Sequence, residues 1–462
     1  MTPAEPHVGA AVLVAGPANS GVAPQCCTVL AHGIGTRSDL PVPVGLAAAA
    51  AAATLVISFA VLAVLWRSPR RRGTGRPLPA GLAAVLDAAP LRLGLQLLTL
   101  AAAVAVVTVG LAGPPDPARN LAPWAFYVTF WVGIVPASLL LGPVWRVLNP
   151  LRLLHRAVAA MLRIDPGAGV RELPEKIGYW PAAVSLAVFG WFELAFPARA
   201  QPVSVAVFLL AYAGVHLAAA TVFGRRWFDR GDGFEVYSVL VGALAPLGRR
   251  AGDGRLVLRN PLDGLAAVPL APGLVGVVVA LLGATAYDGL SRTQLWNALV
   301  PPGLATGTGG LLLAFVLVGV VFGLGTFTVA STRPSAAGGA GGPVAFAPTL
   351  APIAAGYAIA HYFSLLVFDG QQVGILASDP LGTGADLLGT AGRTIDYTVV
   401  GTTTIALVQL GGIVLGHLVA AASAHDQAYR LFPRRVALRT QYPMLAAMVT
   451  LTIGAVGLVF AA

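Results

Sequence analysis

Residues 43–72 read PVGLAAAAAAATLVISFAVLAVLWRSPRRR, and this stretch decides the class of the protein. An apolar run is followed directly by a cluster of arginines. About 20 consecutive apolar residues are enough to cross the hydrocarbon core of a bilayer as a helix. A run of that length ending in positive charge is typical of a transmembrane helix whose last residue faces the cytoplasm.

The same pattern recurs along the whole chain. Hydrophobic residues make up 57% of the 462 residues and charged residues only 10%, whereas a soluble domain carries roughly 25% charged residues. We therefore predict an all-α polytopic integral membrane protein with about ten transmembrane helices. The predicted spans are 43–66, 91–113, 121–145, 180–197, 203–223, 267–287, 304–331, 348–370, 397–420 and 441–461.

The basic residues indicate the orientation of these spans. Of the 29 Lys and Arg residues, 24 fall in the loops of one side and five in the loops of the other. The positive-inside rule assigns the richer side to the cytoplasm, so we expect a multi-pass protein of the plasma membrane with both termini extracytoplasmic. Its basic cytoplasmic loops are predicted at 67–90, 146–179, 224–266 and 421–440. Since topology accounts for the positive charge, we expect the lipid bilayer as a partner and no nucleic acid.

Two connectors are predicted to contain helices that do not cross the membrane, and the N-terminal tail is predicted to lie outside the transmembrane domain. The apolar residues of 146–179 fall on one face with basic residues beside them, which is typical of an amphipathic helix on the anionic inner leaflet. The apolar piece 236–247 is too short to cross and suits an interfacial or re-entrant helix. Residues 1–42 are predicted to be a disordered or processed extracytoplasmic tail, and 43–462 the transmembrane domain.

Polar side chains inside the spans are functional candidates because they are costly in hydrocarbon. At ~1.5 Å per residue, His361, His216 and Gln409 lie roughly 14, 20 and 18 Å from the outer ends of their spans. This layer could ligate a metal ion or a haem iron, handle protons or a substrate, or only hydrogen-bond neighbouring helices. The sequence has no CxxCH, no HExxH and no cysteine in a span, which excludes covalent haem and thiolate metal sites.

Acidic residues mark the other candidate site. Glu193, Asp288, Asp369 and Asp396 fall at the outer ends of predicted spans, and His32 precedes the first span. Together they could form an acidic extracytoplasmic vestibule that binds a divalent cation, and such a cation could activate water for hydrolysis. The same residues could equally be solvated helix ends, so the cofactor is left open between none, a divalent metal and haem.

Four stretches of the chain resemble a known family. They are AHGIGTRSDLPVPVGLAAAAAAATLVISFAVLAVLW (31–66), GDGFEVYSVLVGALAPLG (231–248), Ala360-His361-Tyr362-Phe363 and GHLVAAASAHDQAYRLFPRRVALRTQYPML (416–445). From about residue 31 to its end the chain resembles actinobacterial polytopic membrane proteins often labelled fenitrothion hydrolase. The resemblance implies cleavage of an organophosphate ester, a chemistry that generally uses a metal-activated water. It carries no catalytic residues over to this chain, which also lacks an HxH pattern.

Three classes of function therefore follow from the sequence. A membrane hydrolase acting on a small-molecule substrate requires the outer acids and histidine to converge on a metal ion. A transporter or permease requires a polar cavity among the spans. A haem- or metal-binding membrane subunit requires two histidines that face one pocket.

Overall fold

The computed structural model describes residues 44–70, 73, 75–250, 252–330 and 342–460. Its elements in chain order are α1 (Val44–Leu65), β1 (Arg76–Pro77), α2 (Ala80–Asp87), α3 (Ala89–Ala112), η2 (Pro117–Arg119), α4 (Leu121–Trp124), η3 (Ala125–Val132), α5 (Ile134–Leu141), α6 (Val144–Leu148), α7 (Pro150–Leu162), η4 (Glu175–Ile177), α8 (Trp180–Leu194), α9 (Pro202–Phe223), α10 (Arg226–Arg230), α11 (Gly233–Gly242), β2 (Leu247–Arg249), β3 (Leu256–Leu258), α12 (Pro261–Ala266), α13 (Leu274–Arg292), α14 (Gln294–Leu299), α15 (Leu304–Ala330), η5 (Pro343–Leu350), α16 (Ala351–Leu376), α17 (Thr402–Leu431) and α18 (Arg434–Phe460). The predicted tail 1–42 lies outside the described residues.

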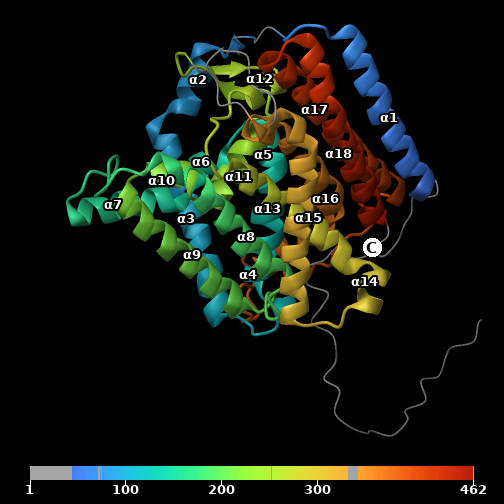
Figure 1. The fold of residues 1–462 in the computed structure, drawn as a ribbon. Helices are drawn as coiled ribbons and strands as arrows, with labels where there is room; N and C mark the ends of the chain where they lie inside the picture. Colours follow the sequence, from blue (N-terminus) through green and yellow to red (C-terminus); the bar gives the residue numbers. More distant parts are fainter. Residues whose placement is uncertain (1–43, 71–72, 74, 251, 331–341, 461–462) are drawn as a thin grey trace, which may run out of the picture.

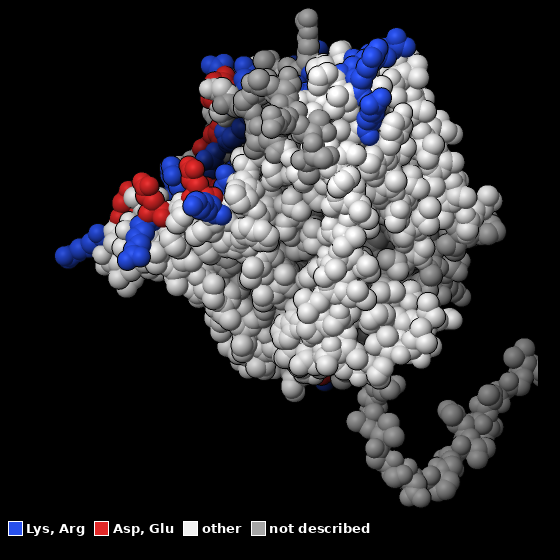
Figure 2. Space-filling model, viewed as in Figure 1, with Lys and Arg blue, Asp and Glu red and all other residues white. Residues whose placement is uncertain are grey.

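The predicted fold class is confirmed. Within the described residues, ten helical segments are long and apolar enough to cross a membrane. Their outward side chains are large and apolar, as on α15, where Leu313, Val316 and Leu324 are exposed. Figure 2 shows charged residues gathered at the top and left of the molecule, with a broad uncharged surface below. Such a surface suits hydrocarbon and not water, because soluble monomers rarely expose large apolar patches.

The helices form one bundle around α13 and α16 (Figure 1). Helix α16 packs along α17 and also contacts α13, while α8 lies against α13. Helix α1 covers α17 and α18 at one edge, and α3 packs on α9 at the opposite edge. Small residues allow the closest approach: a Cβ on Gly356 of α16 would lie 2.4 Å from the Gly412 carbonyl oxygen of α17. Close backbone contact of this kind is how helices associate in lipid.

The sixth predicted span, 267–287, is shifted in the structure to Leu274–Arg292. Pro269 and Pro272 interrupt the chain, and Gly273 adopts a left-handed φ of 82° immediately before the helix. Proline lacks the N–H that a helix interior needs, and glycine tolerates positive φ without a steric cost. The shift moves Asp288 from a predicted helix end into the last turn of α13.

The predicted cytoplasmic loop 421–440 is almost entirely helical. Helix α17 continues to Leu431 and α18 begins at Arg434, so only Phe432 and Pro433 interrupt the helices. The polar residues in this stretch suggested a loop, but they are buried and paired. His425 Nδ1 lies 2.6 Å from Gln441 Oε1, and Arg430 Nε donates to Asp426 Oδ2 at 2.8 Å. A polar helix segment is stable when its side chains find partners inside the protein.

The third span is irregular. It comprises the short helix α4, the π-helical stretch η3 and then α5, which contains Pro136. Proline cannot donate the usual helical hydrogen bond, and both prolines and π-helical turns are known causes of kinks in helices. The irregular stretch carries Trp131, whose ring packs 4.4 Å from that of Phe189 on α8, measured between centroids.

The loops that link the spans on the charged side are themselves structured. Helix α7 matches the amphipathic helix predicted in 146–179; Asn149 caps it by accepting from the Leu151 N–H at 3.0 Å. Helix α11 replaces the interfacial piece predicted at 236–247, but nearly all of it is buried within the bundle. A small antiparallel sheet of order β1-β3-β2, which the sequence analysis did not predict, lies beside α2 and α12. We call this side, with α2, α7, α10, α12 and the sheet, the arginine-rich end.

Candidate functional site

Asp288 is the centre of a buried polar group in the middle of the bundle. Its side chain is 1% exposed, and Arg292, four residues later on α13, donates from Nη2 to both carboxylate oxygens at 2.9 and 3.1 Å. The spacing i, i+4 places the two side chains on one helix face. From α16, the Tyr362 hydroxyl donates to Oδ2 at 3.0 Å and His361 Nε2 lies 2.7 Å from the same oxygen. We call these four residues the Asp288 cluster.

Glu193 lies beside this cluster on α8. It is 7% exposed, and no hydrogen bond joins its carboxylate to any other described residue. The Trp131 indole N–H is also buried, and among the described residues it has no acceptor. Burying a polar group without a partner costs several kcal/mol on the scale of transfer to an apolar solvent, and more for a charge. Two such groups near one another therefore point to something that binds between them.

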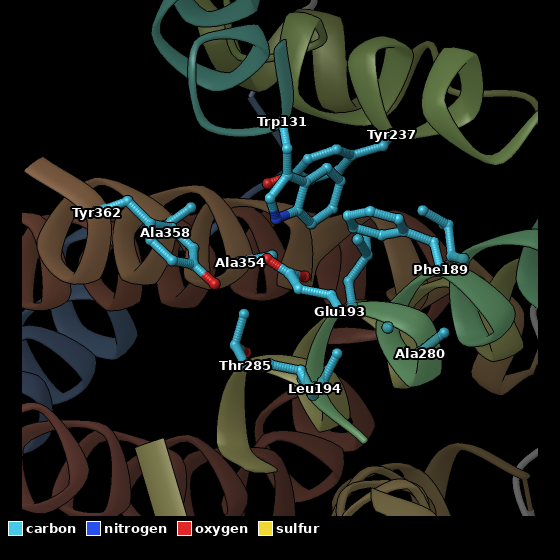
Figure 3. Close-up of a pocket in the computed structure, with 14 residues that line it drawn as sticks. Trp131, Phe189, Glu193, Leu194, Tyr237, Ala280, Thr285, Ala354, Ala358 and Tyr362 are labelled. Atoms are coloured by element: carbon cyan, nitrogen blue, oxygen red, sulfur yellow. The ribbon is translucent and has the colours of Figure 1, made fainter. Parts of the chain in front are cut away.

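A small cavity separates these groups. Its lining includes Trp131, Glu193, Tyr237 and Tyr362, which reach it from η3, α8, α11 and α16 (Figure 3). The centre of a water molecule can occupy about 20 Å³ of it, and ~10–15 Å³ measured in this way is enough for one water. Tyr362 belongs both to the lining and to the Asp288 cluster, so the cavity and the cluster are joined by one hydroxyl group.

The structure places the predicted outer acids in separate positions. Glu193 and Asp288 are brought together in the bundle, whereas Asp369 is buried further along α16. Asp396 is exposed, and its Oδ1 accepts from the Thr398 hydroxyl at 2.6 Å and N–H at 2.8 Å. These hydrogen bonds lower the pKa of Asp396. Its carboxylate is therefore charged, and its hydrogen bonds stay within its own turn. His32, the fifth member of the predicted set, lies outside the described residues.

The mid-membrane histidines have different partners. His216 Nδ1 accepts from the Trp227 indole N–H at 2.9 Å, and its Nε2 lies 3.4 Å from Ser185 Oγ. His361 instead contacts Asp288. Gln409 is half-buried on α17, and no hydrogen bond joins it to either histidine. The equal depth of the three residues thus does not bring them into one site, and two histidines with separate partners do not fit the axial ligation of a haem iron.

The donor groups also fail to fit a resident metal ion. Across the described ranges, no three His, Cys, Asp or Glu side chains are grouped closely enough to hold one. In the Asp288 cluster both carboxylate oxygens already accept from the guanidinium of Arg292. A cation would therefore have to displace a positive charge that is hydrogen-bonded in place.

A second buried network at the arginine-rich end was not predicted from the sequence. Glu235 of α11 is fully buried and accepts from Arg152 Nη2 at 2.5 Å and Nε at 2.8 Å. Burial acts to raise the pKa of Glu235, but the hydrogen bonds and charge of Arg152 outweigh it and hold that pKa below 4.5. Asp232 caps α11 and accepts from the Tyr212 hydroxyl at 2.6 Å, and burial raises its pKa. Helix α11 thus carries acids at one end and Tyr237, which lines the cavity, further along.

The signal for this network was present in the stretch DRGDGFE (229–235), where three of only 19 acidic residues recur at a spacing of three. Such a spacing puts carboxylates near one another at a helix start, where free N–H groups donate to negatively charged oxygens. Which arginines meet them could not be seen in the sequence.

Comparison of the chain with family models, with curated proteins and with solved structures gives no match in any of the three.

Proposed function

We propose that this protein transports protons across the plasma membrane, and that Glu193 takes up and releases the proton. The observation that carries the proposal is the buried Glu193 carboxylate, which lacks a hydrogen-bond partner among the described residues and borders a water-sized cavity within the bundle. A carboxylate in such a place requires a proton, a cation or a bound water to offset its desolvation. Chains of acids and histidines inside the membrane are the usual proton relays of transporters.

The size of the cavity favours a proton over an organic substrate at this position. Pockets for organic ligands enclose about 300–1,000 Å³, whereas this one admits the centre of a water molecule over about 20 Å³. The cavity that Trp131 and Glu193 help to line has room for a single water. Such a water could carry a proton to or from Glu193 without a larger opening of the bundle.

Polar groups on both sides of the cavity supply a route. Tyr362 hydrogen-bonds Asp288, which also contacts His361, and Tyr237 belongs to α11, which is capped by Asp232 and carries Glu235 in its first turn. Under the positive-inside rule the arginine-rich end faces the cytoplasm. Glu193 would then exchange protons with the Asp288 cluster on the outer side and with the α11 network on the inner side.

Hydrolysis of an organophosphate ester, which the family resemblance implies, has less support. That chemistry calls for a metal-activated water, and the acids and histidines of the described residues are not grouped to hold the metal. The cavity beside Glu193 is also far too small for such an ester. Proton transfer is the function that the burial of Glu193 favours.

The test is proton flux through the purified protein in liposomes. The full chain would be reconstituted with an internal pH-sensitive dye, an imposed pH gradient, and potassium with valinomycin to cancel the membrane potential. We expect the wild-type protein to collapse the gradient faster than protein-free liposomes. Glu193→Gln keeps the shape of the side chain and removes its titration, so we expect its rate to fall to the protein-free level.

Asp369→Asn is the matched control, because Asp369 is a buried acid of the same bundle that does not line the cavity. It should retain the wild-type rate. A wild-type rate equal to that of empty liposomes, or full activity in Glu193→Gln, would remove the proposal. An organophosphate assay on the same preparations checks hydrolysis, which should be absent from all of them.

A further inference from the structure

A large basic pocket lies at the arginine-rich end, apart from the cavity at Glu193. It is formed by the start of α3, by α7, by residues 165–167 and by the start of α10, and its volume is about 580 Å³. This is within the range of pockets that bind small organic ligands, about 300–1,000 Å³. Its charged and titratable lining residues are Arg92, Arg152, His155, Arg156, Asp165 and Arg225.

Two of the four arginines already have acidic partners. Arg152 is bound to Glu235 and Asp229, and Arg92 pairs with Asp87. Arg156 and Arg225 have no carboxylate within 4.0 Å among the described residues. Arg156 donates instead to the neutral side chain of Gln96. Two guanidinium groups in one pocket are therefore uncompensated.

The single acid of the lining does not neutralise them. Asp165 is exposed, and its Oδ1 accepts from the Gly167 N–H at 2.8 Å. The polar interior of the pocket is also incomplete. His155 is 1% exposed, and neither its Nε2 nor the buried Nε of Arg92 has a hydrogen-bond partner among the described residues. Buried donors and acceptors are normally satisfied, so the unpartnered Nε–H of Arg92 indicates a ligand that supplies an oxygen atom.

The position of the pocket indicates which anion it binds. Helix α7 extends from the side of the bundle at the arginine-rich end (Figure 1), and charged residues cluster around it in Figure 2. Its last residues, Met161 and Leu162, are exposed and apolar, as is Val170 beyond them. A helix with a charged face and exposed apolar residues suits the plane of the lipid headgroups. The pocket therefore opens at the level at which phosphate groups occur.

We propose that this pocket binds a phosphate group, held by the guanidinium groups of Arg156 and Arg225. Planar guanidinium groups bind phosphate oxygens in pairs and are the preferred cations for this purpose. The phosphate can belong to the headgroup of an anionic phospholipid or be free in the cytoplasm, and the chemistry of recognition is the same in both. The inference does not depend on proton transfer at Glu193, because no residue of the pocket lines that cavity.

The test measures thermal unfolding of the full-length protein in detergent with three probes. These are a short-chain phosphatidylglycerol, the matching phosphatidylcholine, and inorganic phosphate. We expect phosphatidylglycerol to raise the unfolding temperature in a saturable way and phosphatidylcholine to have no effect. A shift with phosphatidylglycerol alone identifies the lipid as the source, and an equal shift with inorganic phosphate identifies the free anion.

The variant Arg156→Gln/Arg225→Gln should weaken binding by about tenfold or more for each arginine lost, since a hydrogen bond to a charged group contributes about 1.5–3 kcal/mol. Both side chains are exposed, so the variant should fold. Arg434→Gln/Arg435→Gln is the matched control, because it removes two exposed arginines outside the pocket. An equal loss in both double variants would assign the effect to diffuse surface charge and overturn the proposal, as would no shift with any probe in the wild type.

A second measurement does not depend on the variants. Phosphorus NMR of the extract from delipidated wild-type protein, after re-exposure to mixed phosphatidylglycerol and phosphatidylcholine, should show enrichment of phosphatidylglycerol. If inorganic phosphate is the ligand, equilibrium dialysis should show its saturable binding instead. Failure of both measurements would rule out the phosphate pocket.

Discussion

His361 Nε2 of α16 lies 2.7 Å from Oδ2 of Asp288 on α13, and both side chains are almost completely removed from solvent. The same carboxylate oxygen accepts from Tyr362, so adjacent residues of one helix converge on one atom of another. Arg292 supplies the opposing charge from α13 itself. A buried charge pair contributes little net stability compared with an apolar replacement, but breaking it is costly. The arrangement therefore makes the loss of the Asp288 carboxylate costly, even though the pair itself adds little net stability.

Replacing Asp288 tests the cost of breaking this cluster. Asp288→Asn keeps the shape but leaves the Arg292 guanidinium and the surrounding donors without their carboxylate, so we expect a loss of about 3–5 kcal/mol in the free energy of unfolding. Denaturant unfolding in detergent, followed by tryptophan fluorescence, measures it. Asp396→Asn serves as control, because that residue is exposed; it should change stability by less than about 0.5 kcal/mol. Equal effects in the two variants would contradict the assignment.

Trp131→Phe tests the cavity from the opposite wall. It keeps an aromatic ring beside Phe189 and removes the indole N–H that faces the cavity. If that N–H holds a water which carries the proton, its loss should slow proton flux about fivefold, the equivalent of a hydrogen bond of about 1 kcal/mol. In the control Trp191→Phe, the lost N–H donates to Thr308 Oγ1 at 3.0 Å, away from the cavity. The liposome assay should find its rate unchanged.

The pair formed by Arg152 and Glu235 predicts a pH dependence of stability. Because Arg152 holds the pKa of Glu235 below 4.5, the pair stabilises the fold above about pH 4.5, and this contribution is lost as the pH falls through the lowered value. In Arg152→Gln, burial is no longer outweighed and the pKa of Glu235 rises. The variant should be about 3–5 kcal/mol less stable than wild type at pH 7.

That difference in stability should become smaller as the pH is lowered towards 4, since a protonated Glu235 needs no counter-charge. Unfolding curves of both proteins at several pH values measure it. A deficit that is the same at pH 7 and pH 4 would mean that Glu235 is not charged in the folded protein.

The contact between α16 and α17 predicts a steric effect. A Cβ on Gly356 would lie 2.4 Å from the Gly412 carbonyl oxygen and 3.0 Å from the Gly416 Cα, both of them backbone atoms. Gly356→Ala should therefore cost about 1–3 kcal/mol in the free energy of unfolding. Gly411→Ala on α17 has no atom within 4 Å of the new Cβ, and it should be neutral or slightly stabilising because alanine favours helix. Thermal unfolding of the two variants in the same detergent measures this difference in stability.

The orientation in the membrane can be tested with single cysteines. After Cys26 and Cys27 are changed to serine, a cysteine is introduced at Leu387 or at Val170, which are 71% and 63% exposed. The positive-inside rule predicts that a membrane-impermeant maleimide labels Leu387→Cys in intact cells and Val170→Cys only after lysis. The reverse pattern would place the arginine-rich end outside.

The partners of single polar residues could not be predicted from the sequence. Hydropathy and helical rise predict that His361 and His216 lie at similar depth, but a helix turns about 100° with each residue. Depth therefore does not say which neighbour a side chain faces, and the structure gives the two histidines the unrelated partners Asp288 and Trp227. The helical structure of 421–440 was not predicted for a related reason. Its polar residues find partners in other parts of the bundle, and hydropathy cannot register this.

The sequence by itself determined the class of the protein and the separation of its charges. Lipid offers no hydrogen bonds to the backbone, so ten long apolar segments have to be helices, and the arginines between them mark one side. Tertiary structure alone decided which polar groups meet. Helix ends, the irregular turn at η3 and close glycine contacts set the rotation of each helix. Those rotations join Asp288 to His361 and leave Glu193 facing a cavity the size of a water molecule.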